Sequence, residues 1–212
     1  MLKVCEIFTS IQGESSFAGI PCTFIRLTGC NLRCTYCDTK YAYNDGKEMS
    51  VKQILTEVER YGFNLVEITG GEPLLQAGVY QLISNIIDNN HTVLIETNGS
   101  VSIKEVDKRA IIILDIKTPG SAMSEKMDFS NFELLKNNDE VKFVLTDRLD
   151  YEWAKEVIVS NNLQKKSHLL MSPAYGILPP ERLVEWMLKD KLDARLNLQI
   201  HKYIFGVEKR RV

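Results

Sequence analysis

The sequence alternates short apolar segments with amphipathic segments along most of its length. The apolar segments predict β-strands at Cys22–Thr28, Leu65–Thr69, Thr92–Glu96, Ile111–Ile116, Val141–Leu145, His168–Met171 and Leu196–Ile200. Segments between them have apolar residues three and four positions apart, which predicts helices at Val51–Tyr61, Ala77–Asp88, Tyr151–Ser160 and Pro180–Lys189. This order predicts an α/β fold, a barrel or partial barrel of mostly parallel strands with outer helices.

The length of 212 residues fits one domain better than two. We see no internal repeat, low-complexity segment or break in composition that would mark a boundary. We therefore expect a single domain over residues 1–212, with residues 1–20 as an N-terminal extension and 201–212 as a C-terminal tail. The opening LKVCEIF predicts an extra strand or a lid.

Charge and hydropathy narrow the class of partner. A formal net charge of −2 argues against a broad nucleic-acid surface, so we expect a small substrate. No apolar run approaches the ~20 residues that span a bilayer, and the first residues do not resemble a secretory signal. These features predict a cytoplasmic protein with no membrane role.

Cys30, Cys34 and Cys37 form a C-x3-C-x2-C loop directly after the first predicted parallel strand. Iron–sulfur proteins that only carry electrons supply four thiolates to a four-iron cluster, so three local cysteines leave one iron open for another ligand. The other two cysteines, Cys5 and Cys22, lie in apolar strands, where small buried residues are expected.

A structural zinc site is the alternative for this loop. Such a site would take its fourth ligand from His91, His168 or His201, all of which are distant in the sequence.

Polar segments follow the predicted strands. TGGEP begins at Thr69, ETNG at Glu96 and DIKTPG at Asp115. Because the carboxyl ends of parallel strands meet at one edge of a sheet, we expect these segments to form a common site. Taken singly, each is also an ordinary turn.

The cysteine loop, with Asn31, Leu32, Arg33 and Tyr36 between its cysteines, resembles the signature of the radical S-adenosylmethionine (SAM) superfamily. TGGEP likewise resembles the GGEP motif of that superfamily. The resemblance implies a four-iron, four-sulfur cluster held by the three cysteines and SAM bound at the open iron. It also implies cofactor-binding roles for Tyr36, Gly70, Gly71, Glu72, Glu96, Asn98 and Lys117.

A second resemblance is narrower and covers most of the chain. IQGE near the start, Phe24-Ile25-Arg26, GGEP, QIH and the basic KRRV end are similar to the 7-carboxy-7-deazaguanine synthases of the queuosine and 7-deazapurine pathway. That family converts 6-carboxy-5,6,7,8-tetrahydropterin to 7-carboxy-7-deazaguanine by a radical ring contraction with loss of ammonia, using Mg²⁺. The resemblance also implies a homodimer and a reducing partner such as flavodoxin or ferredoxin.

The same resemblance carries roles onto matching residues, and residues 1–20 then become a substrate-binding extension. Substrate-binding residues are Gln12, Gly13, Glu14, Arg26, Thr69 and His201, and the Mg²⁺ ligand is Thr39. No side chain is assigned as a catalytic group. The simpler alternatives are an ion pair for Arg26, a turn cap for Thr39 and a structural role for His201.

Two other functions remain open at this point. One is a glycyl-radical-enzyme activase, and the other is a non-enzymatic iron–sulfur or zinc sensor module. The polar IQGE segment and Arg26 favour a closed pocket for a small heterocycle over the open groove that an activase needs. The EKRRV end predicts a tail that folds over the site.

Overall fold

The computed structural model describes residues 1–206 and 209–211. One nine-stranded sheet runs through it, in the order β3-β1-β2-β4-β5-β6-β7-β8-β9. The strands are β1 Leu2–Ile11, β2 Pro21–Leu27, β3 Lys47–Met49, β4 Leu65–Gly70, β5 Thr92–Thr97, β6 Ile111–Lys117, β7 Glu140–Leu145, β8 His168–Pro173 and β9 Arg195–Leu196. Strand β1 pairs antiparallel with β2 and β3, and β2 and β4 to β9 run parallel.

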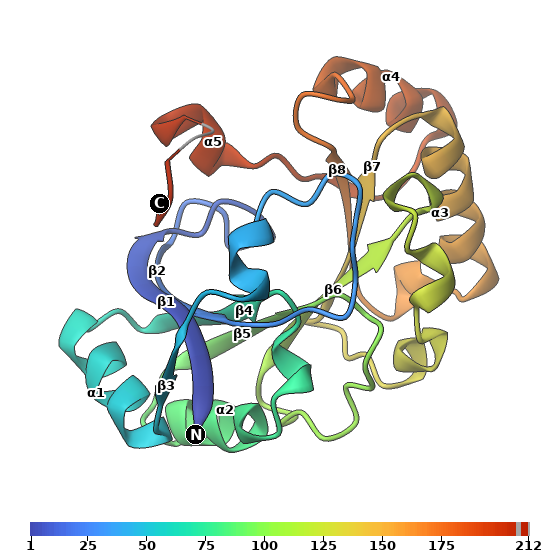
Figure 1. Cartoon of the computed structure of the whole chain (residues 1–212). Coiled ribbons are helices and arrows are strands. Elements are labelled where there is room, and N and C mark those ends of the chain that lie inside the picture. Colours follow the sequence, from blue (N-terminus) through green and yellow to red (C-terminus); the bar gives the residue numbers. More distant parts are fainter. Residues whose placement is uncertain (207–208, 212) are drawn as a thin grey trace.

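Helices cover the outside of this curved sheet, with α1 and α2 at one end and α3 and α4 at the other (Figure 1). The α-helices are α1 Val51–Tyr61, α2 Gly78–Asp88, α3 Arg148–Ser160, α4 Pro180–Asp190 and α5 Ile200–Phe205. Short 3-10 helices are η1 Lys40–Tyr43, η2 Pro73–Leu75, η3 Pro119–Ser121, η4 Ser124–Lys126, η5 Phe129–Glu133 and η6 Leu163–Lys165. The predicted α/β partial barrel is confirmed. No helix of the described residues is long and apolar enough to cross a membrane.

Local chemistry explains the helix ends. Ser50 and Gln53 form a reciprocal capping box at the start of α1, and Gly62 ends that helix in the left-handed conformation. Helix α3 begins three residues before the predicted Tyr151, because the Asp147 side chain accepts a hydrogen bond from the backbone N–H of Asp150.

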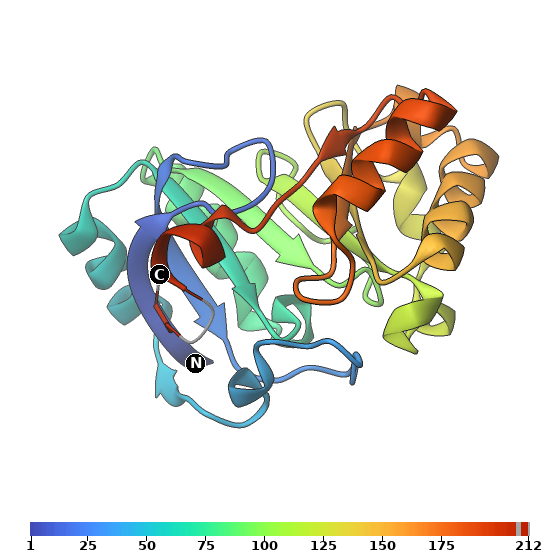
Figure 2. The same ribbon diagram turned by 90° about the horizontal axis from the view of Figure 1, so that it is seen from above.

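The predicted last strand, Leu196–Ile200, is wrong beyond Leu196. The backbone leaves the sheet there, because Ile200 donates its N–H to the carbonyl of Gly13 rather than to a neighbouring strand. Ile200 then begins α5, so His201 lies on a short helix and not on a strand. This segment brings α5 beside β1 and β2 (Figure 2).

Two apolar clusters fill the molecule. The larger lies between the sheet and the outer helices, and the smaller consists of Phe8, Cys22, Phe24, Leu65, Leu94 and Ile113. In the smaller cluster the rings of Phe8 and Phe24 stack with centroids 5.0 Å apart. As predicted, Cys22 is fully buried; Cys5 is half-buried.

Substitutions on α4 test the outer packing layer. Leu183 is fully buried and Leu188 is 73% exposed on the same helix. Leu183→Ala is expected to lower the free energy of unfolding by about 2 to 5 kcal/mol, because it leaves a cavity in the core. Leu188→Ala, the matched control, should change it by less than about 0.5 kcal/mol. Urea denaturation measures both, and equal effects would contradict this packing.

Candidate functional site

A cavity of about 610 Å³ opens at the carboxyl ends of the parallel strands. Residues from the N-terminal loop, the cysteine loop, the strand ends and α5 line it. Of the residues predicted for the site, those that reach its wall are Gln12, Gly13, Glu14, Arg26, Cys30, Cys34, Tyr36, Cys37, Thr39, Thr69, Gly70, Gly71, Glu96, Asn98, Lys117 and His201. The fold therefore brings together segments from both ends of the chain.

Glu72 is the predicted residue that does not line this cavity. Its carboxylate is fully buried and accepts hydrogen bonds from the N–H groups of Leu74 (2.9 Å) and Asn98 (2.7 Å) and from the hydroxyl of Thr97 (2.9 Å). Burial raises the pKa of Glu72, and these hydrogen bonds offset part of the shift. Glu72 thus ties the glycine turn after β4 to the turn after β5.

The cysteine loop leaves β2 and lies in front of the sheet (Figure 1). Cys30, Cys34 and Cys37 are all free, half-buried thiols on the cavity wall. The Cys30 sulfur accepts hydrogen bonds from the Leu32 N–H (3.4 Å) and the Asn98 side-chain amide (3.8 Å). Burial raises the pKa of the Cys30 and Cys34 thiols, and the charge of Lys117 opposes the shift at Cys34.

Backbone packing holds this loop against the next strand. Gly71 donates its N–H to the carbonyl of Leu27 (3.4 Å), and Glu72 donates to that of Gly29 (2.8 Å). A Cβ at Gly71 would overlap the Gly29 carbonyl and the Cys30 side chain. The close approach of the two backbone segments therefore requires glycine at this position. Three thiols on one cavity wall suit a cluster.

The positions of the histidines also bear on the zinc alternative. Of the three candidate histidines, His201 lies on the cavity wall, while His91 contacts the Phe63 carbonyl and Glu59 elsewhere. Within residues 1–206 and 209–211, no three His, Cys, Asp or Glu side chains are grouped so as to hold one metal ion.

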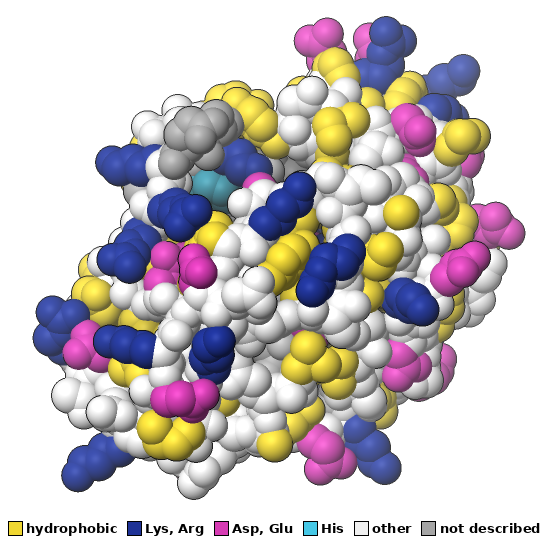
Figure 3. All heavy atoms as spheres, in the orientation of Figure 1, with side chains coloured by type: hydrophobic (Ala, Val, Ile, Leu, Met, Phe, Trp, Pro, Cys, Tyr) yellow, Lys and Arg dark blue, Asp and Glu magenta, His cyan; other side chains and the backbone are white. Residues whose placement is uncertain are grey.

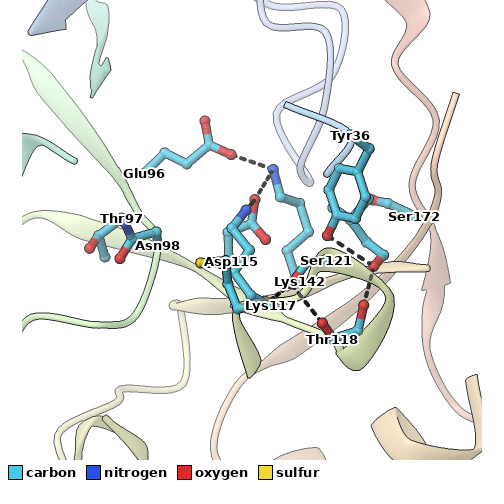
Figure 4. A network of polar contacts seen from close by, with 12 residues as sticks. Tyr36, Glu96, Thr97, Asn98, Asp115, Lys117, Thr118, Ser121, Lys142 and Ser172 are labelled. Carbon is cyan, nitrogen blue, oxygen red and sulfur yellow. Dashed lines mark hydrogen bonds and ion pairs between the residues drawn. The ribbon is translucent and has the colours of Figure 1, made fainter. Parts of the chain in front are cut away.

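Ion pairs connect the strand ends on the cavity floor (Figure 4). Lys142 contacts Glu96 and lies 3.2 Å from Asp115, which is also 2.9 Å from Lys117. Asp115 and Lys142 are neighbours in the β6–β7 register. Burial lowers the pKa of Lys117, but the Asp115 charge outweighs it and raises the pKa overall, so Lys117 stays charged.

The N-terminal loop supplies the opposite wall. Gln12 donates from its amide to Glu67, and its Oε1 accepts the Glu14 N–H at 2.8 Å. Glu14 in turn forms an ion pair with Lys142 (3.0 Å) and accepts a hydrogen bond from the Gln199 amide (2.8 Å). A side chain at Gly13 would overlap the His201 ring, so this glycine leaves the space that the histidine occupies.

Arg26 has the ion pair that its simpler interpretation predicts, whereas the Thr39 side chain makes no cap hydrogen bond at the start of η1. Both residues reach the cavity. Arg26 donates from Nε to Glu6 at 2.8 Å, and Tyr41 donates to the same carboxylate at 2.9 Å. The Thr39 hydroxyl donates to Asp38 at 2.9 Å. Burial raises the pKa of Asp38, but its ion pair with Lys202 dominates and lowers the value to about 2.

The sequence analysis assigned no individual role to several polar residues of this cavity, although Asp115 begins one of the polar segments expected at this edge. These residues are Glu67, Asp115, Lys142, Ser172 and Gln199. One signal was present, because a lysine at the centre of the buried strand EVKFVL is unusual and needs a partner. The identity of that partner is not visible in the sequence, since Glu14 is 128 positions away.

Comparison with known proteins agrees with this geometry. Residues 24–121 match the model of the radical SAM superfamily. A 7-carboxy-7-deazaguanine synthase from Chlorobaculum tepidum is 44% identical over all of this chain and 97% of that protein. One from Clostridium acetobutylicum is 41% identical over 99% of each chain.

Solved structures show the same fold. QueE from Escherichia coli superposes with a TM-score of 0.76 at 24% identity, covering 93% of both chains. Streptococcus suis SuiB superposes with a TM-score of 0.56 at 18% identity, over 81% of this chain and 46% of that one.

The partial barrel, the cysteine loop and the matching model define a radical SAM enzyme, which implies a four-iron, four-sulfur cluster and SAM. At the level of identity found over its full length, the chain belongs to the 7-carboxy-7-deazaguanine synthase family. The activase and sensor alternatives are not favoured by these relatives.

Gly71→Ala tests how the loop is held. The added methyl group would overlap the Gly29 backbone and the Cys30 Cβ, so the cysteine loop is expected to shift and the reconstituted protein to hold less iron and sulfide per chain. Gly78→Ala is the control, since its Cβ would approach only the flexible Leu2 side chain and the Met1 carbonyl at 3.2 Å or more. Full iron content in Gly71→Ala would show that the loop tolerates displacement.

Proposed function

We propose that this chain converts 6-carboxy-5,6,7,8-tetrahydropterin to 7-carboxy-7-deazaguanine by a radical ring contraction with loss of ammonia, in queuosine and 7-deazapurine biosynthesis. The observation that carries the proposal is the placement of Gln12, Glu14 and Arg26 on the same cavity as the three cysteine thiols. Full-length similarity to the 7-carboxy-7-deazaguanine synthases supports the choice of substrate.

The cofactor half of the cavity lies at the ends of β2, β4, β5 and β6. Bound there, the cluster supplies the electron that cleaves SAM to methionine and a 5′-deoxyadenosyl radical. Cys30, Cys34 and Cys37 would hold the cluster, and the glycine turn at Gly70 and Gly71 lets the methionyl group approach the backbone. Further roles in SAM binding fall to Tyr36, Glu72, Glu96, Asn98 and Lys117, with Glu72 acting through the Asn98 backbone.

The substrate half lies between the N-terminal loop and α5. Glu14 accepts hydrogen bonds from the aminopyrimidine edge of the pterin, and the remaining N–H of the Gln12 amide donates to an acceptor there. Arg26 uses its terminal guanidinium nitrogens for the substrate carboxylate, because only its Nε is taken by Glu6. Thr69 and His201 complete this wall.

We assign Mg²⁺ to Thr39. The Thr39 hydroxyl is an oxygen ligand on the cavity wall beside the Asp38 carboxylate. Mg²⁺ needs few protein ligands, since it keeps waters and binds substrate oxygens. The donor set at this position fits such an ion.

The remaining assignments concern partners and organisation. A reducing protein such as flavodoxin or ferredoxin would approach the face that carries the cysteine loop, where Lys and Arg side chains are spread (Figure 3) and Arg33 and Lys40 are exposed. Exposed Tyr175, Ile177 and Tyr203 suit a homodimer contact. We further propose a cytoplasmic location.

We also propose one domain, with residues 1–20 as a substrate-binding extension and 201–212 as a tail over the site. Lys209, Arg210 and Arg211 line the cavity, and the Arg210 guanidinium lies 4.0 Å from the Tyr41 ring centroid. Residues 207, 208 and 212 of the tail lie outside the described residues.

The decisive experiment incubates reconstituted, reduced protein with SAM, Mg²⁺ and 6-carboxytetrahydropterin. 7-Carboxy-7-deazaguanine and 5′-deoxyadenosine are expected by mass spectrometry. Arg26→Ala should keep the cluster but lower kcat/KM by about tenfold to a hundredfold, because a charged hydrogen-bond donor to the substrate carboxylate is lost. Arg60→Ala, an exposed arginine on α1, is the control and should be unchanged. A sensor module would form no 5′-deoxyadenosine.

Thr39→Val tests the Mg²⁺ assignment. Valine has the shape of threonine without the hydroxyl, so the Mg²⁺ concentration for half-maximal activity should rise on the order of tenfold. Thr35→Val is the matched control, because the Thr35 hydroxyl donates to the Gly120 carbonyl and does not line the cavity. An unchanged Mg²⁺ dependence in Thr39→Val would remove Thr39 from the metal site.

A further inference from the structure

Lys142 is a buried cation on the cavity floor whose contacts come from three separate parts of the chain. Its side chain projects from β7 and is 5% exposed. The Nζ atom lies 3.0 Å from Glu14 of the N-terminal loop. It also lies 3.2 Å from Asp115 of β6 and contacts Glu96 at the end of β5 (Figure 4).

Lys142 faces more carboxyl groups than other basic groups. The carboxyl groups that face it are Glu14, Glu67, Glu96 and Asp115, and the other basic groups nearby are Arg26, Lys117 and His201. Arg26 is paired with Glu6, and Lys117 with Asp115. Within the described part of the chain, Lys142 is the cation that forms ion pairs with both Glu14 and Glu96.

His201 does not replace this charge. Burial lowers the pKa of its imidazole, although the charge of Glu14 opposes the shift, so the ring is neutral at physiological pH. Gln199 also donates to Glu14, at 2.8 Å, but it carries no charge.

We infer that Lys142 is a positioning residue that holds the Glu14 and Glu96 side chains side by side, so that both accept hydrogen bonds from the substrate and cosubstrate. The inference rests on the proposed function and adds to it a residue that makes no contact with the reacting atoms. Lys142 also links the N-terminal loop to the barrel, because Glu14 comes from the loop and Glu96 from β5.

The protonation state of Glu14 depends on this contact. Burial by itself raises the pKa of Glu14, but the ammonium of Lys142 and the hydrogen bond from Gln199 outweigh it, and the pKa is lowered overall. Without Lys142, a partly buried Glu14 would face Glu96 with no cation between them. Its pKa would then rise, and at neutral pH a larger fraction would be protonated and unable to accept hydrogen bonds with both oxygens.

Lys142→Met in the full-length, reconstituted enzyme tests the inference. The KM for 6-carboxytetrahydropterin is expected to rise by about tenfold to a hundredfold, the size of a lost charged hydrogen bond, with a smaller change in kcat. The acid limb of the kcat/KM profile should move to higher pH, because Glu14 now ionises at higher pH. Iron content should stay near wild type, while 5′-deoxyadenosine formed without pterin should fall at low SAM concentration, because Glu96 loses the same ion pair.

Two further variants separate positioning from general damage. Lys142→Arg keeps the positive charge and should recover most of the loss in KM and return the acid limb toward its wild-type position. Lys136→Met removes a lysine from the buried Asp139, 2.8 Å away and outside the cavity. Like Lys142→Met, this variant removes an ion pair to a carboxylate, here the fully buried Asp139. It should leave KM and the pH profile unchanged.

The outcomes are distinct. A wild-type KM and pH profile in Lys142→Met would overturn this inference alone, and so would equal defects in Lys142→Met and Lys142→Arg. Absence of deazaguanine from the wild-type enzyme, with SAM still cleaved, would overturn the proposed function and this inference with it.

Discussion

Parallel pairing of β2 with β4 and of β4 with β5 is the constraint from which the site follows. Each strand ends at the same edge, so the loops that leave them must share one space. The cysteine loop after β2 meets the glycine turn after β4 at Gly71, where a side chain larger than hydrogen would not fit. Glu72 then fastens the turn after β5 to the same place.

The inner face of the partial barrel changes character along its strands. Toward their amino ends, this face carries the apolar side chains of Phe24, Leu94 and Ile113, with Glu67 between Phe24 and Leu94. Toward their carboxyl ends, carboxylates and lysines face one another. Buried charges of this kind persist only when they are paired, and here the pairing itself connects strands and loops.

The two ends of the chain complete the cavity. The Asn197 side chain accepts the Ser15 N–H at 2.7 Å, and Ile200 bonds to Gly13, so the segment after β9 is held on the N-terminal loop. This capture draws the backbone out of the sheet and places His201 against Gly13. Residues 12 to 14 and 201, which we propose bind the substrate, therefore form one wall, although they are far apart in the sequence.

By itself, the sequence determined the α/β class, most strand and helix positions, and the residues of the cysteine loop and the polar strand ends. These follow from local periodicity and short motifs, which act over a few residues. Only the tertiary structure decided that Ile200 starts a helix, that Glu72 lies behind the wall, and that Lys142 meets Glu14. Those outcomes depend on contacts between distant segments, where burial, close backbone approach and charge pairing outweigh local preference.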